Sequence, residues 1–143
     1  MSYWKNTKEL PFFIGNFVQA GMILSPLALI YLILPFGKEV DGHYMSYGEI
    51  WKSGAGICLF LFFVLELLGC WGIAARKQNS CWAFIFAPIV LPILLSLFHH
   101  LNGAAWSENA SSPAYIVMAI IIGTFFYAYL FYSSAMRAYF KGK

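Results

Sequence analysis

Apolar residues occur in four long runs that are separated by short polar segments. The runs cover residues 12–34, 54–75, 81–101 and 114–136, and each is continuously apolar rather than alternating. A helix rises about 1.5 Å per residue, so about 20 residues cross the hydrocarbon core of a bilayer. The strands of a membrane barrel would be about half as long and would alternate. The pattern predicts an all-α fold: a polytopic, up-down bundle of four transmembrane helices that forms one domain over residues 1–143.

Composition supports a lipid-facing chain. Hydrophobic residues make up 61% of the sequence and charged residues only 10%, whereas soluble domains carry about 25% charged residues. The surplus of apolar surface is expected to face lipid. The first run is longer than the apolar core of about 7–15 residues in a signal peptide, so we expect it to be a retained helix.

The basic residues predict an orientation. Four hairpinned helices place the two chain ends and the turn between the second and third runs on one side. That side carries seven of the nine basic residues, namely Lys5, Lys8, Arg76, Lys77, Arg137, Lys141 and Lys143, while the other side carries Lys38 and Lys52. Because positive loops remain in the cytoplasm, both termini are expected to be cytoplasmic. No basic stripe with stacking aromatics indicates a nucleic-acid partner.

Glu66 is the charged residue that lies deepest within an apolar run. An ionised carboxylate in the middle of a bilayer costs several kcal/mol, so intramembrane acids usually face the interior of a bundle. Gly69 and Cys70 lie one turn further on, and small residues mark contacts between membrane helices. We therefore expect Glu66 to point into the bundle.

Counting residues from the outer boundary places several polar groups at the depth of Glu66. The predicted intramembrane polar cluster contains Met22, Ser25, Glu66, Pro88 and Tyr127. Pro26 and Pro92 each free a backbone carbonyl in this layer, to which a protonated Glu66 could donate while accepting from Tyr127. Two interpretations stay open: a polar contact that fixes helix register, or a site that handles a proton, an ion or a ligand.

The histidines are weak candidates for an outer-face metal site. His99 and His100 end the third run, and His43 lies in the first outer loop. Adjacent helical residues point about 100° apart, and the spacing matches no established ligand pattern, so we expect no metal. A haem is also not expected, because no second run offers an axial histidine, and we expect no other cofactor. The three cysteines are expected to be buried free thiols.

Three short motifs carry a family resemblance. They are Gly21-Met-Ile-Leu-Ser25-Pro26, Leu65-Glu66-Leu-Leu-Gly69 and Tyr129-Leu-Phe-Tyr-Ser133-Ser-Ala-Met-Arg137-Ala-Tyr-Phe140. In this order they resemble the family of small bacterial inner-membrane proteins that includes YdgK. The chain departs from the family pattern at Ala135, where the family has arginine, and at Phe126, where it has tryptophan. The resemblance implies a bacterial inner-membrane location and a four-helix fold, and it implies no activity.

Three functional hypotheses follow from these observations. Minimal loops and the lack of a visible nucleophile with a nearby base favour a non-enzymatic accessory protein, either a small subunit of a membrane complex or an immunity-type protein. Its partners would be the lipid bilayer and another membrane protein or a second copy of itself. The alternative is a small oligomeric transporter or proton-coupled channel that uses Glu66. A membrane enzyme acting on lipid or quinone is a further alternative.

Overall fold

The computed structural model describes residues 3–40, 42–102 and 112–142, except for the side chains of His99 and Asn102. The described residues form seven α-helices, a short 3-10 helix and one small hairpin. In chain order these are α1 (Tyr3–Thr7), α2 (Phe12–Ile33), β1 (Lys38–Val40), β2 (His43–Met45), α3 (Tyr47–Lys52), α4 (Ala55–Ala74), η1 (Gln78–Ser80), α5 (Cys81–Asn102), α6 (Pro113–Tyr132) and α7 (Ser134–Phe140). The prediction of a helical fold is confirmed apart from this hairpin.

Four helices are long and apolar enough to cross a membrane, and each overlaps one of the four predicted runs. They are α2, α4, η1 with most of α5, and α6. Only 22–33% of the most apolar window of each helix is buried inside the structure. Soluble monomers rarely expose apolar surface on this scale, and such outward faces are typical of helices that contact lipid. The chain is therefore a multi-pass membrane protein.

The fourth predicted span is longer than the helix that forms. α6 ends at Tyr132 rather than at residue 136, because Ser133 adopts an extended conformation with ψ of 133°. The chain then starts α7, which turns back so that Met136 and Tyr139 are buried in the core. The predicted span over 114–136 is therefore too long, and the candidate span is Pro113–Tyr132. The apolar run continues beyond it because apolar residues of α7 pack into the core.

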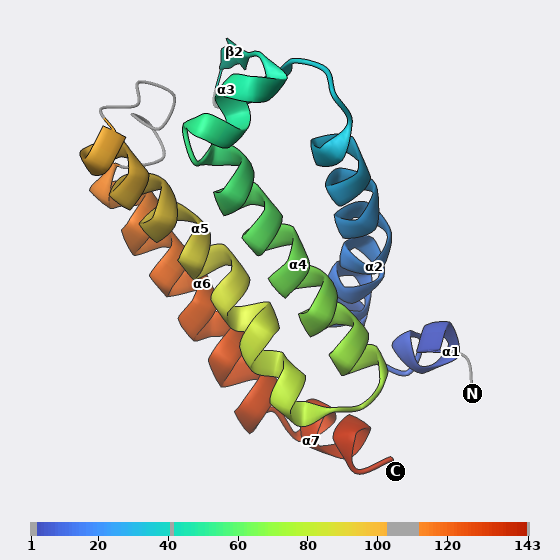
Figure 1. Cartoon of the computed structure of the whole chain (residues 1–143). Helices are drawn as coiled ribbons and strands as arrows, with labels where there is room; N and C mark the ends of the chain where they lie inside the picture. The colour runs from blue at the N-terminus through green and yellow to red at the C-terminus, as the bar shows by residue number, and fades with distance from the viewer. Residues whose placement is uncertain (1–2, 41, 103–111, 143) are drawn as a thin grey trace.

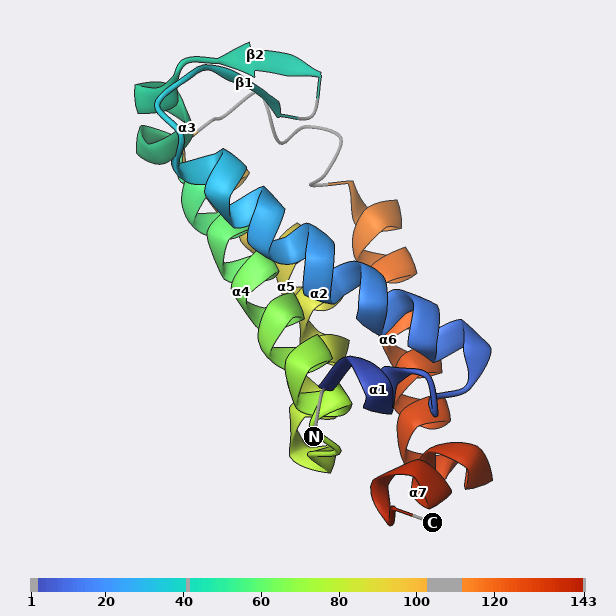
Figure 2. The ribbon, with the colours of Figure 1, turned by 90° about the vertical axis from the view of Figure 1, so that its right-hand side faces the viewer.

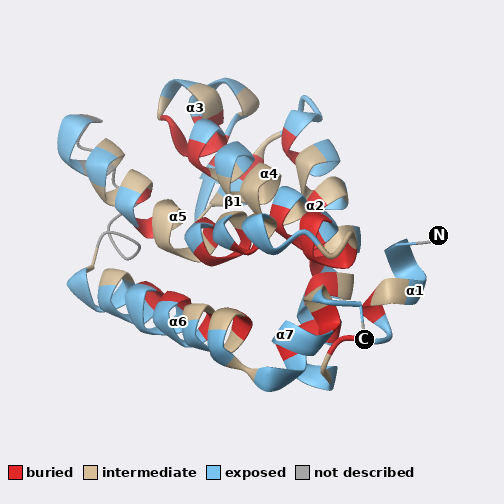
Figure 3. Ribbon diagram, turned by 90° about the horizontal axis from the view of Figure 1, so that it is seen from below, coloured by how far each residue is buried: buried red, intermediate tan, exposed pale blue. Residues whose placement is uncertain are grey.

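The helices alternate in direction, but the bundle is not closed. α4 packs against α2 on one side and α5 on the other, and α6 packs against α5, so the helices follow one another in an arc (Figures 1 and 3). Contact between α2 and α6, which would close a four-helix bundle, is nearly confined to phenylalanine rings near one end of the two helices. The up-down order is as predicted, whereas the fourth side of the bundle is open.

The segment between α2 and α4 is folded rather than a simple wet loop. β1 and β2 pair antiparallel, with Lys38 opposite Met45 and Val40 opposite His43, and they lie with α3 at one end of the helices (Figure 2). A capping box starts α3, in which the Ser46 hydroxyl accepts from the Glu49 backbone N–H and the Glu49 carboxylate accepts from the Ser46 N–H. The hairpin and the capping box both provide hydrogen-bond partners for backbone groups within this short segment. We call this end of the molecule the hairpin end.

Lys38 is a buried lysine in this segment. Its side chain is only 3% exposed. The ammonium group donates to the carbonyls of Leu34 at 2.7 Å and Phe36 at 2.9 Å. It also lies 4.5–5.4 Å from the ring centres of Tyr31, Phe36 and Tyr47. Lys38 therefore satisfies carbonyls at the C-terminal end of α2, where a positive charge is favourable.

The opposite end, which we call the terminal end, gathers α1, α7 and the α4–η1 turn (Figure 2). Arg76 lies in the α4–η1 turn, and its guanidinium pairs with the carboxylate of Glu9, between α1 and α2, and donates to the Tyr139 carbonyl of α7 at 3.0 Å. The Tyr139 hydroxyl in turn donates to the Ile73 carbonyl at 2.9 Å. Burial raises the pKa of Tyr139 to about 12, more than the nearby Arg76 charge lowers it.

Candidate functional site

Glu66 lies near the middle of α4, on the face that packs against α2. The Ser25 hydroxyl donates to Glu66 Oε2 at 3.0 Å, and Ser25 itself is fully buried. One turn earlier on α2, Gly21 lets the helices approach so closely that a Cβ there would collide with the Cys70 sulfur. The same Cβ would lie 3.5 Å from Glu66 Oε1. Small residues on α2 thus hold the carboxyl group directly between the two helices.

Ser25 supplies the only hydrogen bond to the Glu66 side chain within the described part of the chain. A carboxylate has two oxygens and about four acceptor positions, so one hydroxyl satisfies a small part of this capacity. Glu66 is half-buried rather than fully enclosed. The carboxyl group is consequently positioned by α2 but still has capacity for another donor or cation.

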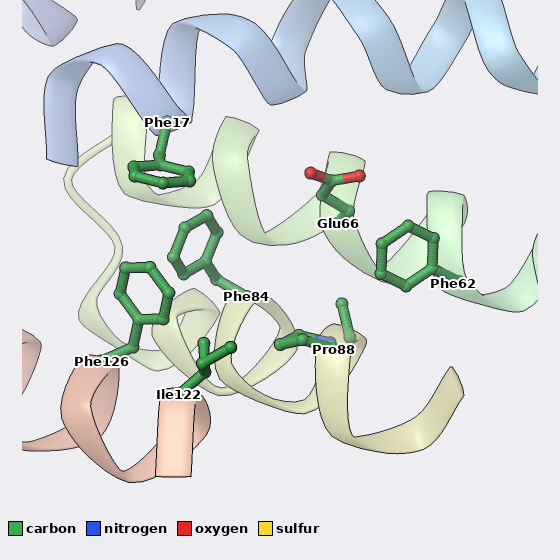
Figure 4. A pocket seen from close by; sticks show the side chains of 8 residues that line it. Phe17, Phe62, Glu66, Phe84, Pro88, Ile122 and Phe126 are labelled. Carbon is green, nitrogen blue, oxygen red and sulfur yellow. The ribbon is translucent and has the colours of Figure 1, made fainter. Parts of the chain in front are cut away.

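Glu66 also forms part of the wall of a cavity, which we call the Glu66 cavity (Figure 4). The cavity has a volume of about 180 Å³ and lies among α2, α4, α5 and α6. Apart from Glu66, its wall is apolar and consists of Phe17, Phe62, Phe84, Ala87, Pro88, Ile122 and Phe126. A single acidic group therefore faces a space that is otherwise bounded by hydrocarbon.

Three of the phenylalanine rings in this wall support one another from different helices. The ring of Phe126 on α6 meets Phe17 of α2 edge-on at 5.7 Å, and it meets Phe84 of α5 edge-on at 5.2 Å. Edge-to-face pairs of this kind are favourable beyond simple burial. The rings hold α6 near α2 and fix this side of the cavity.

Two apolar depressions adjoin the Glu66 cavity. One, of about 360 Å³, continues along α5 and α6 toward the hairpin end and shares Phe62, Pro88 and Ile122 with the cavity. The other, of about 430 Å³, lies between α2 and α6 and shares Phe17, Ile122 and Phe126 with it. The second depression lies at the open side of the bundle, so the cavity is bordered by surface that would face lipid.

The structure brings some members of the predicted polar cluster together and separates another. Ser25 and Glu66 are hydrogen-bonded, and Pro88 lines the cavity opposite them. Met22 packs partly buried against the main core. Tyr127 does not reach Glu66: its hydroxyl lies 3.5 Å from that of Tyr132 and its ring packs against Trp82 at 5.5 Å. The predicted Tyr127–Glu66 contact is therefore wrong, because equal depth does not fix which way a helix is rotated.

The histidines give no sign of a metal centre in the described residues. His43 is exposed on β2 and His100 is exposed near the end of α5, while the His99 side chain lies outside the description. No group of three or more histidine, cysteine or acidic side chains in the described ranges is arranged to hold a metal ion. Cys58, Cys70 and Cys81 are buried free thiols, as predicted.

The aromatic wall is the part of the site that sequence reasoning missed. Phe62 precedes Glu66 by one helical turn, so it could have been placed on the same face of α4. Phe17, Phe84 and Phe126 come from three other helices, and no short sequence pattern links them. The chain matches no known family model, and comparison with curated proteins and with solved structures also finds no match. The site must therefore be interpreted from its own geometry.

Proposed function

We propose that the chain is a non-enzymatic accessory or interaction protein of the bacterial inner membrane, either a small subunit of a membrane complex or an immunity-type protein. The open side of the bundle is the observation that carries this proposal. α2 and α6 flank that side, and the depression between them is lined by Phe13, Phe17, Ile121, Ile122, Phe125 and Phe126. A membrane partner, including a second copy of the chain, could pack along these helices and complete the bundle.

The proposed orientation places the terminal end in the cytoplasm. Arg76 lies at this end with α1 and α7, and the segments around it carry most of the basic residues of the chain. This charge distribution supports cytoplasmic termini. A tag fused after Lys143 should be inaccessible to a reagent confined to the periplasm. Labelling of that tag in intact cells would reverse the orientation.

Site-specific crosslinking in membranes tests the interaction directly. A photoreactive residue at Ile121, which is 56% exposed beside the open side, should capture a discrete partner that also co-purifies in mild detergent. Leu68 on α4 is 58% exposed and lines neither depression, so it serves as the matched control. Equal capture at both positions, or none together with a monodisperse monomer, would remove the proposal.

A second candidate function is proton-coupled transport, and the position of Glu66 in the cavity wall favours it. An acid next to an apolar cavity near the middle of a membrane helix could exchange a proton for a substrate. Four helices are few for a complete pathway, so this function requires an oligomer. Uptake by proteoliposomes should be lost in Glu66→Gln and retained in Glu39→Gln, which changes a carboxylate on the exposed hairpin. Equal uptake by both variants would exclude a proton-coupled role for Glu66.

A further inference from the structure

The Glu66 cavity combines an acidic group with several aromatic rings in a small space. Four phenylalanines contribute to its wall, one from each of the four long helices, and among the described residues Glu66 is the one ionisable group that lines it. Aromatic rings attract organic cations through their electron-rich faces, and alkylated ammonium groups are the ligands most often recognised in this way. A carboxylate on the same wall supplies the opposing charge.

We infer that the Glu66 cavity binds a lipophilic organic cation, specifically an alkylated ammonium group attached to a compact apolar body. The positive group would lie beside the carboxyl group of Glu66, whose Oε2 also accepts from Ser25. The apolar body would contact the phenylalanine rings and extend toward Pro88. If the chain is a proton-coupled transporter, as in the second candidate function, this cation is the class of substrate that it would carry. Binding of the cation itself does not depend on transport.

Other ligand classes fit the cavity less well. A hydrated metal ion needs several oxygen ligands, and the cavity wall offers the carboxyl group of a single residue. An anion would be repelled by Glu66 and would find no basic side chain in the wall. A neutral hydrocarbon would enter without using the carboxyl group at all. An organic cation is the class that uses both the charge and the rings.

Entry from the bilayer is consistent with the position of the cavity. The depression between α2 and α6 shares three wall residues with the cavity and is bounded by apolar side chains. A lipophilic cation concentrates at the boundary between headgroups and acyl chains, so it could approach through this side without crossing a polar barrier. The edge-to-face contact of Phe17 with Phe126 lies on this route.

Binding of benzyltrimethylammonium to the purified protein in lipid nanodiscs tests the inference. The compound presents a quaternary ammonium and one phenyl ring, and its carbon isostere neopentylbenzene has nearly the same shape without the charge. Wild-type protein should bind the cation, and Glu66→Gln should weaken that binding by about tenfold or more because the counter-charge is lost. Binding of the neutral isostere should be the same in both proteins.

Aromatic variants provide a second measurement that leaves the carboxyl group in place. Phe62→Leu should weaken binding of the cation by about three- to fivefold, because one ring face is removed. Phe60→Leu, on the same helix but outside the cavity wall, should leave the affinity unchanged. Circular dichroism and elution volume would establish that each variant keeps its fold before its affinity is compared.

The possible results separate the ligand site from the transport function. Specific binding that depends on Glu66 and Phe62, without uptake by proteoliposomes, supports the ligand site and removes transport. Absence of measurable binding to folded wild-type protein overturns the inference, as does equal loss of affinity in Phe60→Leu and Phe62→Leu. Binding of the cation that is unchanged in Glu66→Gln also overturns it.

Discussion

Lys38 and Glu66 both hold an ionisable group away from bulk water, but the protein surrounds the two groups differently. The Lys38 ammonium has two carbonyl acceptors and three aromatic rings around it, all from the short stretch between residues 31 and 47. Glu66 has one hydrogen bond, from a different helix, and lines a cavity. Removal from water lowers the pKa of Lys38, and the carbonyls and rings oppose that effect.

The difference separates a structural charge from a candidate binding charge. A buried charged group is tolerated when its hydrogen-bonding capacity is used by nearby groups. Lys38 meets this condition with its own chain segment, so it fixes the end of α2 and has little capacity for an external ligand. Glu66 meets it only in part, and its side chain lines a cavity that a small molecule can enter.

The largest expected effect comes from removing the Lys38 charge. Lys38→Met keeps the apolar stem but leaves the carbonyls of Leu34 and Phe36 without their donor. Loss of two charge-assisted hydrogen bonds should lower the free energy of local opening at the hairpin end by about 3 kcal/mol. Hydrogen exchange at the amides of β1 and β2 measures this opening. Lys52→Met, at an exposed position, should change the exchange little, and equal effects of both variants would contradict the structural role of Lys38.

Adding a methyl group at the close contact between α2 and α4 should produce the next largest loss of stability. Gly21→Ala places a methyl group against the Cys70 sulfur, and overpacking of this kind costs about 1–3 kcal/mol. The loss should appear in denaturant titration of the detergent-solubilised protein. Cys70→Ala combined with Gly21→Ala should restore much of the stability by making room for the methyl group. Gly48→Ala meets nothing within 4 Å and is the matched control; a similar loss there would exclude the proposed collision.

Changing Glu66 itself should affect stability less than either substitution. Glu66→Gln keeps a carbonyl oxygen that can accept from Ser25, so the free energy of unfolding should change by less than about 1 kcal/mol. Ser25→Ala removes the donor and should cost about 1 kcal/mol. Denaturant titration of both variants checks the ranking. If Glu66→Gln proves as damaging as Lys38→Met, Glu66 is a structural residue and the contrast between the two sites disappears.

A loss of stability that is confined to alkaline pH is expected at the terminal end. The folded protein holds the Tyr139 proton more tightly than an unfolded chain does, since its pKa is about 12 and an exposed tyrosine titrates near 10. The stabilisation is therefore complete below about pH 10 and is lost as the pH rises toward 12. Thermal unfolding should move to lower temperature across this window. Tyr139→Phe should reduce the shift, and an unchanged pH profile in that variant would assign the shift to another group.

The parts of this fold that depend on one segment were predictable, whereas the parts that depend on helix rotation were not. The four spans follow from apolar run length, and depth counting put Ser25 in the layer of Glu66, to which it proves to be hydrogen-bonded. The same counting failed for Tyr127, because rotation of α6 directs its ring toward Trp82. The open side of the bundle is likewise a property of packing between helices that are distant in sequence.

Several local features left signals that a closer inspection of the sequence could have used. The dipeptide Asp-Gly at positions 41 and 42 is a sequence signal for a hairpin turn, and Ser46 followed three residues later by Glu49 is a signal for a capping box. The end of α6 is harder to predict, because Ser133 and Ser134 are the only polar break before apolar residues resume. The Glu66 cavity could not be predicted, since its wall draws single phenylalanines from four different helices.

The contacts of Arg76 also constrain how the protein is assembled during translation. The guanidinium pairs with Glu9, which leaves the ribosome before any of the long helices, and with the Tyr139 carbonyl, which leaves after all four. Arg76 itself is synthesised between these two partners and has a left-handed backbone conformation with φ of 59°. The nascent chain can therefore complete this three-way junction only once the last helix has been inserted, so the junction marks the end of membrane integration.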